Sequence, residues 1–204
     1  LLNEGGLLAF VTSRGIADTP GNKFVREYLV NHADLISAIR LPDMLFMQTS
    51  GIEVGSDLLI FQKHTRKAAL SQREQLFLQV GREKADATGT MTEYANKLFT
   101  IPKTTLATGS RIVQNQYGKY VRKYQWQGNE NAMSQYLAAL LKLDFGRYFR
   151  KSLFMGEGQG SEDMQMSLFG SVAMKQVAKG KRAYTDGVEA WMKDGTMVLF
   201  EGQV

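Results

Sequence analysis

The chain has 204 residues, with 25 Lys and Arg against 20 Asp and Glu and a formal net charge of +5, which modestly favours an anionic partner. The absence of cysteine excludes disulfides and thiolate metal sites, and two histidines are too few for a zinc cluster, so we expect no metal site. We also expect neither a signal peptide nor a membrane helix, because no apolar run approaches the roughly 18 residues that a span needs, and we expect a cytoplasmic protein.

The first third of the chain predicts an α/β unit. An apolar run over residues 7–11 follows two glycines and predicts a strand buried on both faces, as in the middle of a parallel sheet. Thr19-Pro20 is a helix start signal. The helix should bury one apolar face, formed by Phe24, Val25, Tyr28 and Leu29.

Two more strands are predicted over residues 35–39 and 57–61. The first two strands are joined by a helix and should be parallel. The third should pair antiparallel, because no clear helix separates it from the second.

The order of short motifs over residues 4–63 matches a known pattern. The matching pieces are the Gly5-Gly6 strand ending at Thr12-Ser13, the helix with Arg26 and Leu29, the run Ile39-Arg40-Leu41-Pro42, the loop with Phe46 and Gly51-Ile52, and the strand over 57–61 followed by Gln62-Lys63. In these features the chain resembles the carboxyl-terminal half of the catalytic domain of N6-adenine DNA methyltransferases, especially the modification subunits of type I restriction systems. More loosely, the whole chain is similar to a middle piece of long bacterial methylase–helicase proteins carried by mobile elements.

The resemblance implies a fold, a cofactor and a substrate contact. Residues 1–66 would be the carboxyl-terminal half of a class I, Rossmann-like methyltransferase sheet, and the parent protein would use S-adenosylmethionine. Phe46 would align with the aromatic residue that stacks on the flipped adenine. Alternatively, Phe46 is a core residue, since Met44, Leu45 and Met47 flank it.

Two motifs of that family do not occur in this sequence. The three prolines, Pro20, Pro42 and Pro102, are never adjacent, so the Pro-Pro motif that holds the target amine is missing. Gly5-Gly6 precedes a strand, whereas a cofactor-binding glycine turn follows one. We expect both motifs upstream of Leu1. The chain would then be a fragment that binds no S-adenosylmethionine, contains no catalytic residue and is inactive alone.

The middle of the chain predicts a connector over residues 67–92 and a helical region with a hairpin over 93–155. Ser71 and Glu74 have the spacing of a capping box, and the polar residues 81–92 favour a domain boundary. A short helix around Tyr94 should stop before Pro102. Residues 111–114 and 120–126 would be the arms of a hairpin with Gly118 in its turn, and residues 133–141 predict the clearest helix.

No Asp or Glu occurs between Tyr94 and Asn129, although six Lys and Arg residues do. Basic groups can neutralise phosphates and aromatic rings can stack on bases, so this stretch is a candidate DNA contact. The candidate residues are Lys119, Tyr120, Arg122, Lys123 and Tyr124. The alternative is an ordinary half-buried hairpin with lysines extending into solvent.

Residues 156–204 read as a linker and the start of a further module. Within them, Gln165-Met166-Ser167-Leu168-Phe169 resembles the short peptide by which bacterial DNA-processing proteins bind the replication sliding clamp. Gln165 would supply hydrogen bonds, and Leu168 and Phe169 would fill an apolar pocket. The alternative is a linker that packs these side chains on its own fold.

These observations favour a fragment of an S-adenosylmethionine-dependent N6-adenine DNA methyltransferase. The competing hypothesis is a non-catalytic DNA-binding or protein-docking segment of a mobile-element protein. A structural remnant with neither activity is the third.

Overall fold

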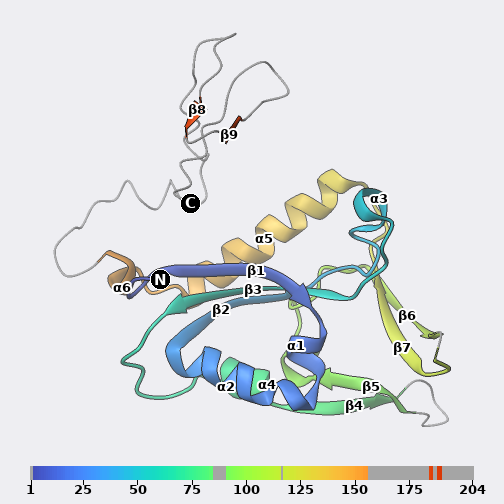
Figure 1. Ribbon diagram of the computed structural model, residues 1–204, viewed down its shortest axis with the longest axis horizontal. Helices are drawn as coiled ribbons and strands as arrows, with labels where there is room; N and C mark the ends of the chain where they lie inside the picture. Colours follow the sequence, from blue (N-terminus) through green and yellow to red (C-terminus); the bar gives the residue numbers. More distant parts are fainter. Residues whose placement is uncertain (1, 85–90, 116, 156–183, 186–187, 190–204) are drawn as a thin grey trace. The chain divides into compact units, whose positions relative to one another are not determined.

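The computed structural model describes residues 2–84, 91–115, 117–155, 184–185 and 188–189 (Figure 1). Leu1–Gly158 form one compact unit and Gln159–Val204 a second. In the second unit the described residues are two short paired strands, Tyr184–Thr185 (β8) and Val188–Glu189 (β9). The first unit contains both helices and sheets, so the mixed α/β class predicted from the sequence is confirmed.

A three-stranded sheet in the order β1-β3-β2 is the centre of the first unit. Its strands are Leu7–Ser13 (β1), Ala33–Arg40 (β2) and Ser56–Lys63 (β3). The central strand β3 is antiparallel to both neighbours, so β1 and β2 run in the same direction without touching. The predicted antiparallel third strand is therefore confirmed, and the first two strands share a direction but do not pair.

Strand β1 lies at the edge of the sheet, and the prediction that it is buried on both faces was wrong. Leu8 is 42% exposed and Val11 is 51% exposed. Phe10 packs on the core on one face, where its ring stacks on Phe61, and Leu7 packs against the cluster of Ile36, Ile60 and Phe145. An unbroken apolar run is typical of a strand with neighbours on both sides. In the described part of the chain, β1 has one neighbour.

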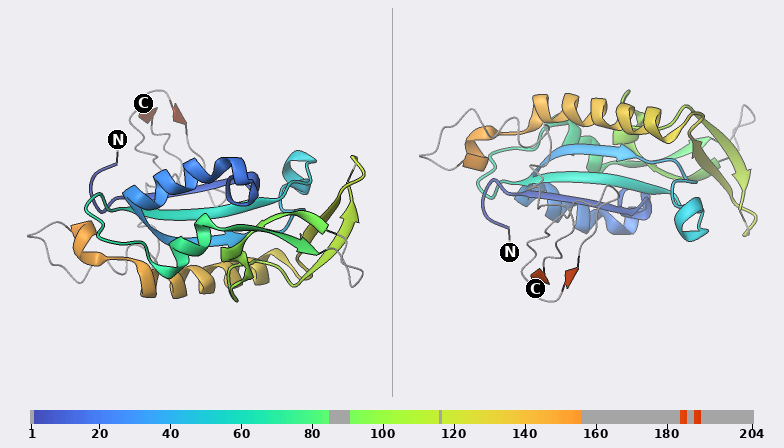
Figure 2. Two further views of the ribbon diagram at one scale, coloured as in Figure 1. Left: turned by 90° about the horizontal axis from the view of Figure 1, so that it is seen from below. Right: turned by 90° about the horizontal axis from the view of Figure 1, so that it is seen from above.

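Helices cover both faces of the sheet (Figure 2). One face packs on α1 (Gly15–Asp18), α2 (Lys23–His32) and α4 (Gln72–Leu78), with the short 3-10 helix Pro20–Asn22 (η1) between the first two. The other face packs on the long helix α5 (Glu130–Tyr148). Ile39 and Ile60 point toward α5, where they meet Leu140 and Phe145 respectively.

Helix α2 buries only part of the predicted face, because Leu29 packs on the core but the two aromatic side chains do not. Phe24 and Tyr28 are 68% and 66% exposed, whereas Arg26 and Val30 are buried. The Arg26 guanidinium donates hydrogen bonds of 2.9 Å to the carbonyl oxygens of Ile16 and Thr19. These carbonyls at the end of α1 need donors, and this requirement turns the arginine inward.

A β-bulge in β2 changes which side chains face each side of the sheet. The register with β3 shifts between Leu35 and Ser37, so Ile36 is the extra residue. Ile36 and Ser37 consequently both face α5, and Arg40 faces the side of α1 and α4. The bulge therefore determines where the charged end of β2 points.

The segment after β3 contains both a confirmed and a wrong prediction. Ser71 and Glu74 form a complete capping box at the start of α4. Val80–Lys84 (β4) then pairs with Met91–Asn96 (β5) within the first unit, where the sequence favoured a domain boundary. Tyr94 lies in β5 rather than in a helix, and only the short 3-10 helix Lys97–Thr100 (η2) precedes Pro102.

The predicted hairpin and long helix are confirmed. Gly109–Gln114 (β6) pairs with Tyr120–Gln125 (β7), and Gly118 in the turn has a φ of +73°. Asn129 caps α5 by accepting a 2.8 Å hydrogen bond from the Ala132 amide. The described part of the unit ends with Lys151–Met155 (α6).

Candidate functional site

A buried group of charges lies where β1 and β2 end and β3 begins. Arg40, the last residue of β2, is 2% exposed and lies between two carboxylates. Its Nε donates to Asp57 Oδ1 at 2.9 Å, and its Nη2 donates to both Asp18 oxygens at 2.8 and 2.9 Å. The centroid of the Phe99 ring lies 4.0 Å from the guanidinium carbon. The guanidinium of Arg40 therefore has carboxylates as hydrogen-bond partners and an aromatic ring against its flat face.

The environment keeps Arg40 charged. Burial opposes its charge, but the attraction of Asp57 and Asp18 outweighs burial and raises the pKa of the guanidinium well above its usual value. The Asp18 carboxylate has a further partner, the backbone amide of Asn96 at 2.8 Å. A guanidinium bound in this way is a structural anchor and is not available to a ligand.

Arg14 forms a second centre of charge next to the first. Its Nη2 forms an ion pair with Asp43, and its Nη1 donates to the Arg122 carbonyl at 2.7 Å and lies 3.4 Å from Glu93. These partners come from the loop after β2, from β7 and from β5. One side chain at the end of β1 therefore ties three other segments together.

Gly55 makes this position of Arg14 possible. A Cβ atom at residue 55 would lie 2.0 Å from Arg14 Nη2 and 2.3 Å from its Cζ. The Arg14 amide also donates to the Gly55 carbonyl at 3.0 Å. A side chain at residue 55 would displace the arginine from its partners.

Tyr124 lies between the two arginines. The guanidinium carbons of Arg14 and Arg40 are each 5.6 Å from its ring centroid. Burial raises the pKa of its phenol. Its backbone amide donates to Asp43 Oδ2 at 2.6 Å, which completes the hydrogen bonds of that carboxylate.

The loop over residues 41–55 is held at both ends near Arg14 and Asp43, and Phe46 lies within it. Three backbone hydrogen bonds hold it. The Leu41 amide donates to the Ser56 carbonyl at 2.9 Å, and the Val54 amide donates to the Asp43 carbonyl at 3.0 Å. The Asp43 amide donates to the Tyr124 carbonyl at 3.0 Å. Phe46 is half-buried and precedes the short helix Met47–Ser50 (α3). Among the described residues, Phe46 belongs to none of the three buried clusters, although its neighbour Leu45 packs on one of them.

The structure separates the predicted DNA-contact residues into two groups. Arg122 donates to Glu83 at 2.7 Å, Lys123 lies 2.5 Å from Glu53, and Tyr124 is enclosed by the arginines. Lys119 and Tyr120 are exposed at the tip of the hairpin. Carboxylates from other segments therefore pair with Arg122 and Lys123, two of the six cations in the stretch that has no acids of its own.

The sequence prediction missed Arg14, Asp18, Arg40 and Asp57 as one group. A weak signal was present, because an arginine directly follows the apolar run of β2 and an aspartate opens the run of β3. The predicted clamp-binding residues Gln165, Leu168 and Phe169 lie outside the residues that the structure describes.

Within the described residues, no cluster of His, Asp and Glu could hold a metal ion, and no helix is long and apolar enough to cross a membrane. No protein-family model, curated protein or solved structure matches the chain.

Proposed function

We propose that this chain is the carboxyl-terminal half of the catalytic sheet of an S-adenosylmethionine-dependent N6-adenine DNA methyltransferase. Two strands of one direction flank an antiparallel third, and sheets that mix parallel and antiparallel strands are common among large α/β sheets. The residues that carry the resemblance lie in β1, α2, β2, β3 and the loop over residues 41–55. The directions of the three strands thus support the proposal over residues 4–63, the same residues that carry the sequence resemblance.

The observation that carries the proposal is the position of Phe46. In α/β sheets, ligands bind beyond the carboxyl ends of parallel strands, and Phe46 belongs to the loop that begins where β2 ends. Its half-buried ring lies outside the buried clusters of the described residues. A flipped base stacked on such a ring gains roughly 1–3 kcal/mol.

The remaining strands of the sheet would pair with β1. Its outer edge has no neighbour among the described residues, and the exposed Leu8 and Val11 would be covered by further structure. In this proposal, a strand from the upstream half of the enzyme, which would hold the cofactor, pairs with the outer edge of β1.

The turn at Gly5 has no room for S-adenosylmethionine. A Cβ atom at Gly5 would lie 1.8 Å from the Leu153 carbonyl oxygen, so the glycine turn is already filled by the chain itself. The Gly5 amide is bonded to the Lys63 carbonyl at 2.9 Å. The function of this half is therefore to support the loop over residues 41–55 and to receive the base.

Substitutions of Phe46 in the longer protein test this role. Phe46→Leu keeps an apolar side chain but removes the stacking ring, and Phe46→Trp keeps the ring. We expect the leucine variant to lose affinity for DNA with an extrahelical adenine by about tenfold and the tryptophan variant to retain it. Both should keep the wild-type melting temperature and cofactor affinity. Equal DNA affinity of the two variants would contradict the stacking role.

A second candidate function, DNA docking without catalysis, is favoured by the tip of the β6–β7 hairpin. Tyr117 is 76% exposed, Tyr120 is 43% exposed and Lys119 lies between them. Because Lys123 is paired with Glu53, only Lys119 of these two lysines is free for a phosphate. Lys119→Ala should flatten the log–log salt dependence of duplex binding by about one unit, and Lys123→Ala should leave it unchanged. Identical slopes for wild type and Lys119→Ala would exclude this contact.

A further inference from the structure

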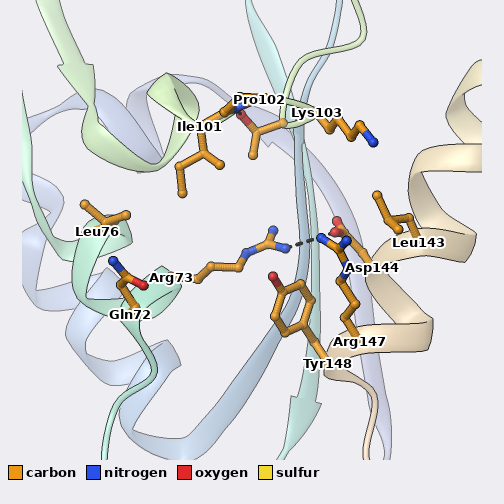
Figure 3. A pocket seen from close by; sticks show the side chains of 11 residues that line it. Gln72, Arg73, Leu76, Ile101, Pro102, Lys103, Leu143, Asp144, Arg147 and Tyr148 are labelled. Atoms are coloured by element: carbon orange, nitrogen blue, oxygen red, sulfur yellow. Dashed lines mark hydrogen bonds and ion pairs between the residues drawn. The ribbon is translucent and has the colours of Figure 1, made fainter.

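A hollow of about 380 Å³ lies between α4, the turn after η2 and α5 (Figure 3). We call it the α4–α5 hollow. Its walls carry the cations Arg73, Lys103 and Arg147, and one acid, Asp144. Leu76, Ile101 and Leu143 supply apolar surface. Its volume is in the range of small-molecule sites, which is roughly 300–1,000 Å³.

Arg73 is a largely buried cation in the wall of this hollow. Its Nη1 donates to Asp144 Oδ1 at 2.9 Å, and its guanidinium carbon lies 4.4 Å from the Tyr148 ring centroid. The Nε and Nη2 atoms are buried and have no hydrogen-bond partner among the described residues. Both atoms are shielded from solvent, so Arg73 acts on a ligand in the hollow through its positive charge.

Asp144 carries one negative charge and balances one of the three cations, Arg73, to which it is bonded. Oδ2 accepts a 2.7 Å hydrogen bond from Ser37 Oγ, which the bulge of β2 directs toward α5. Arg73 occupies Oδ1. In the described part of the chain, Lys103 and Arg147 form no ion pair, so the lining has two uncompensated positive charges.

Lys103 is held at this position in a strained backbone conformation. Its φ is +69°, and it is the one described residue other than glycine with a positive φ. It follows Pro102, and Thr104 Oγ1 closes the turn by donating to the Ile101 carbonyl at 2.7 Å. A turn with proline followed by positive φ usually has glycine at that place. Strain of this kind is found where a side chain has a function, and Figure 3 shows Lys103 extending along the rim toward α5.

We propose that the α4–α5 hollow binds a phosphate group. Arg73 supplies a largely buried positive charge, the exposed Lys103 and Arg147 supply charged donors from opposite walls, and Tyr148 contributes a hydroxyl that is turned toward the hollow in Figure 3. The phosphate belongs either to a free mononucleotide, whose remaining parts contact Leu76 and Leu143, or to the backbone of a nucleic acid. This site lies between α4 and α5, and the proposal does not depend on the methyltransferase function.

Calorimetric titration of the chain of 204 residues tests the proposal with three probes: inorganic phosphate, adenosine monophosphate and a short single-stranded oligonucleotide. Arg147→Gln removes one cation from the hollow, and Lys142→Gln removes an exposed cation from the same helix outside the lining. We expect the first variant to weaken phosphate binding about tenfold and the second to leave it nearly unchanged, because a charge-assisted hydrogen bond is lost only in the first.

Lys103→Gly separates binding from folding. Glycine adopts a φ of +69° without strain, so this variant should melt at or above the wild-type temperature while its affinity falls about tenfold. Binding of the monophosphate identifies a free ligand, and binding of the oligonucleotide alone, with the same loss in the variants, identifies a nucleic-acid backbone. Absence of binding by all three probes, or equal affinities for Arg147→Gln and Lys142→Gln, would overturn the proposal.

Discussion

Arg40 and Asp57 pair at the end of the sheet with almost no contact with solvent: Arg40 Nε lies 2.9 Å from Asp57 Oδ1, and the exposed fractions of the two side chains are 2% and 0%. Asp18 approaches the same guanidinium from α1. One cation therefore compensates two buried carboxylates. This group, together with Arg14 and Asp43, fixes the loop that carries Phe46.

Removal of Arg40 should destabilise the fold strongly. Arg40→Met keeps most of the side-chain volume but leaves Asp57 and Asp18 buried without a cation, which typically costs about 3–5 kcal/mol. Urea unfolding of wild type and variant measures this loss in the free energy of unfolding.

Lys23→Met provides the control for that measurement. Lys23 pairs with Glu27 on the surface of α2 at 3.3 Å, and such exposed pairs contribute roughly 0–1 kcal/mol. Comparable losses for Lys23→Met and Arg40→Met would show that the buried group contributes no more than a surface ion pair.

Gly55→Ala should displace Arg14. The new methyl group would lie 2.0 Å from Arg14 Nη2, and the buried Asp43 would lose its cation. We expect a loss of about 2–4 kcal/mol in the free energy of unfolding. In an Arg14→Ala background the same change should cost almost nothing, because the collision has been removed. Additive losses in the double variant would mean that Gly55 is required for another reason.

The stability contribution of Glu93 should depend on pH. Burial raises the pKa of its carboxyl above the ordinary value of 4.5, although Arg14 acts in the opposite direction. The native state then binds more protons than the unfolded state in the window above pH 4.5, so wild type loses stability there as the pH rises.

Glu93→Gln removes this titration. The difference in unfolding free energy, wild type minus variant, should therefore fall as the pH rises through that window. Since the side chain is about a third exposed, the change should be small. A difference that grows with pH would show that the attraction to Arg14 dominates.

Local signals explain which elements the sequence predicts well. The capping box of Ser71 and Glu74, the turn at Gly118 and the cap at Asn129 each depend on residues a few positions apart. The apolar runs of β2 and β3 form strands as predicted, and they are buried. In these segments neighbouring residues suffice to determine the conformation.

Distant partners explain what the sequence does not predict. The buried face of α2 depends on carbonyls of α1 that accept from Arg26, and hydropathy alone selected Phe24 and Tyr28 instead. Tyr94 became part of a strand because β4 lies beside it. Tertiary contacts of this kind override local propensity.

The candidate site illustrates the same limit. The hairpin contains no acid, yet Arg122 and Lys123 meet Glu83 and Glu53, and Tyr124 meets Asp43 across 81 residues of sequence. Net charge along a segment does not reveal charges that other segments bring to it. Only the residues at the tip, Lys119 and Tyr120, keep the exposure that the sequence suggested.

Transfer of a labelled methyl group from S-adenosylmethionine to DNA, by the longer protein that we propose to contain this chain, tests the central proposal most directly. We predict that the label appears in adenine as N6-methyladenine and that Phe46→Leu lowers the rate while Phe46→Trp preserves it. The chain of 204 residues alone should transfer no label. A folded longer protein that binds the cofactor but leaves adenine unmethylated would contradict the proposal.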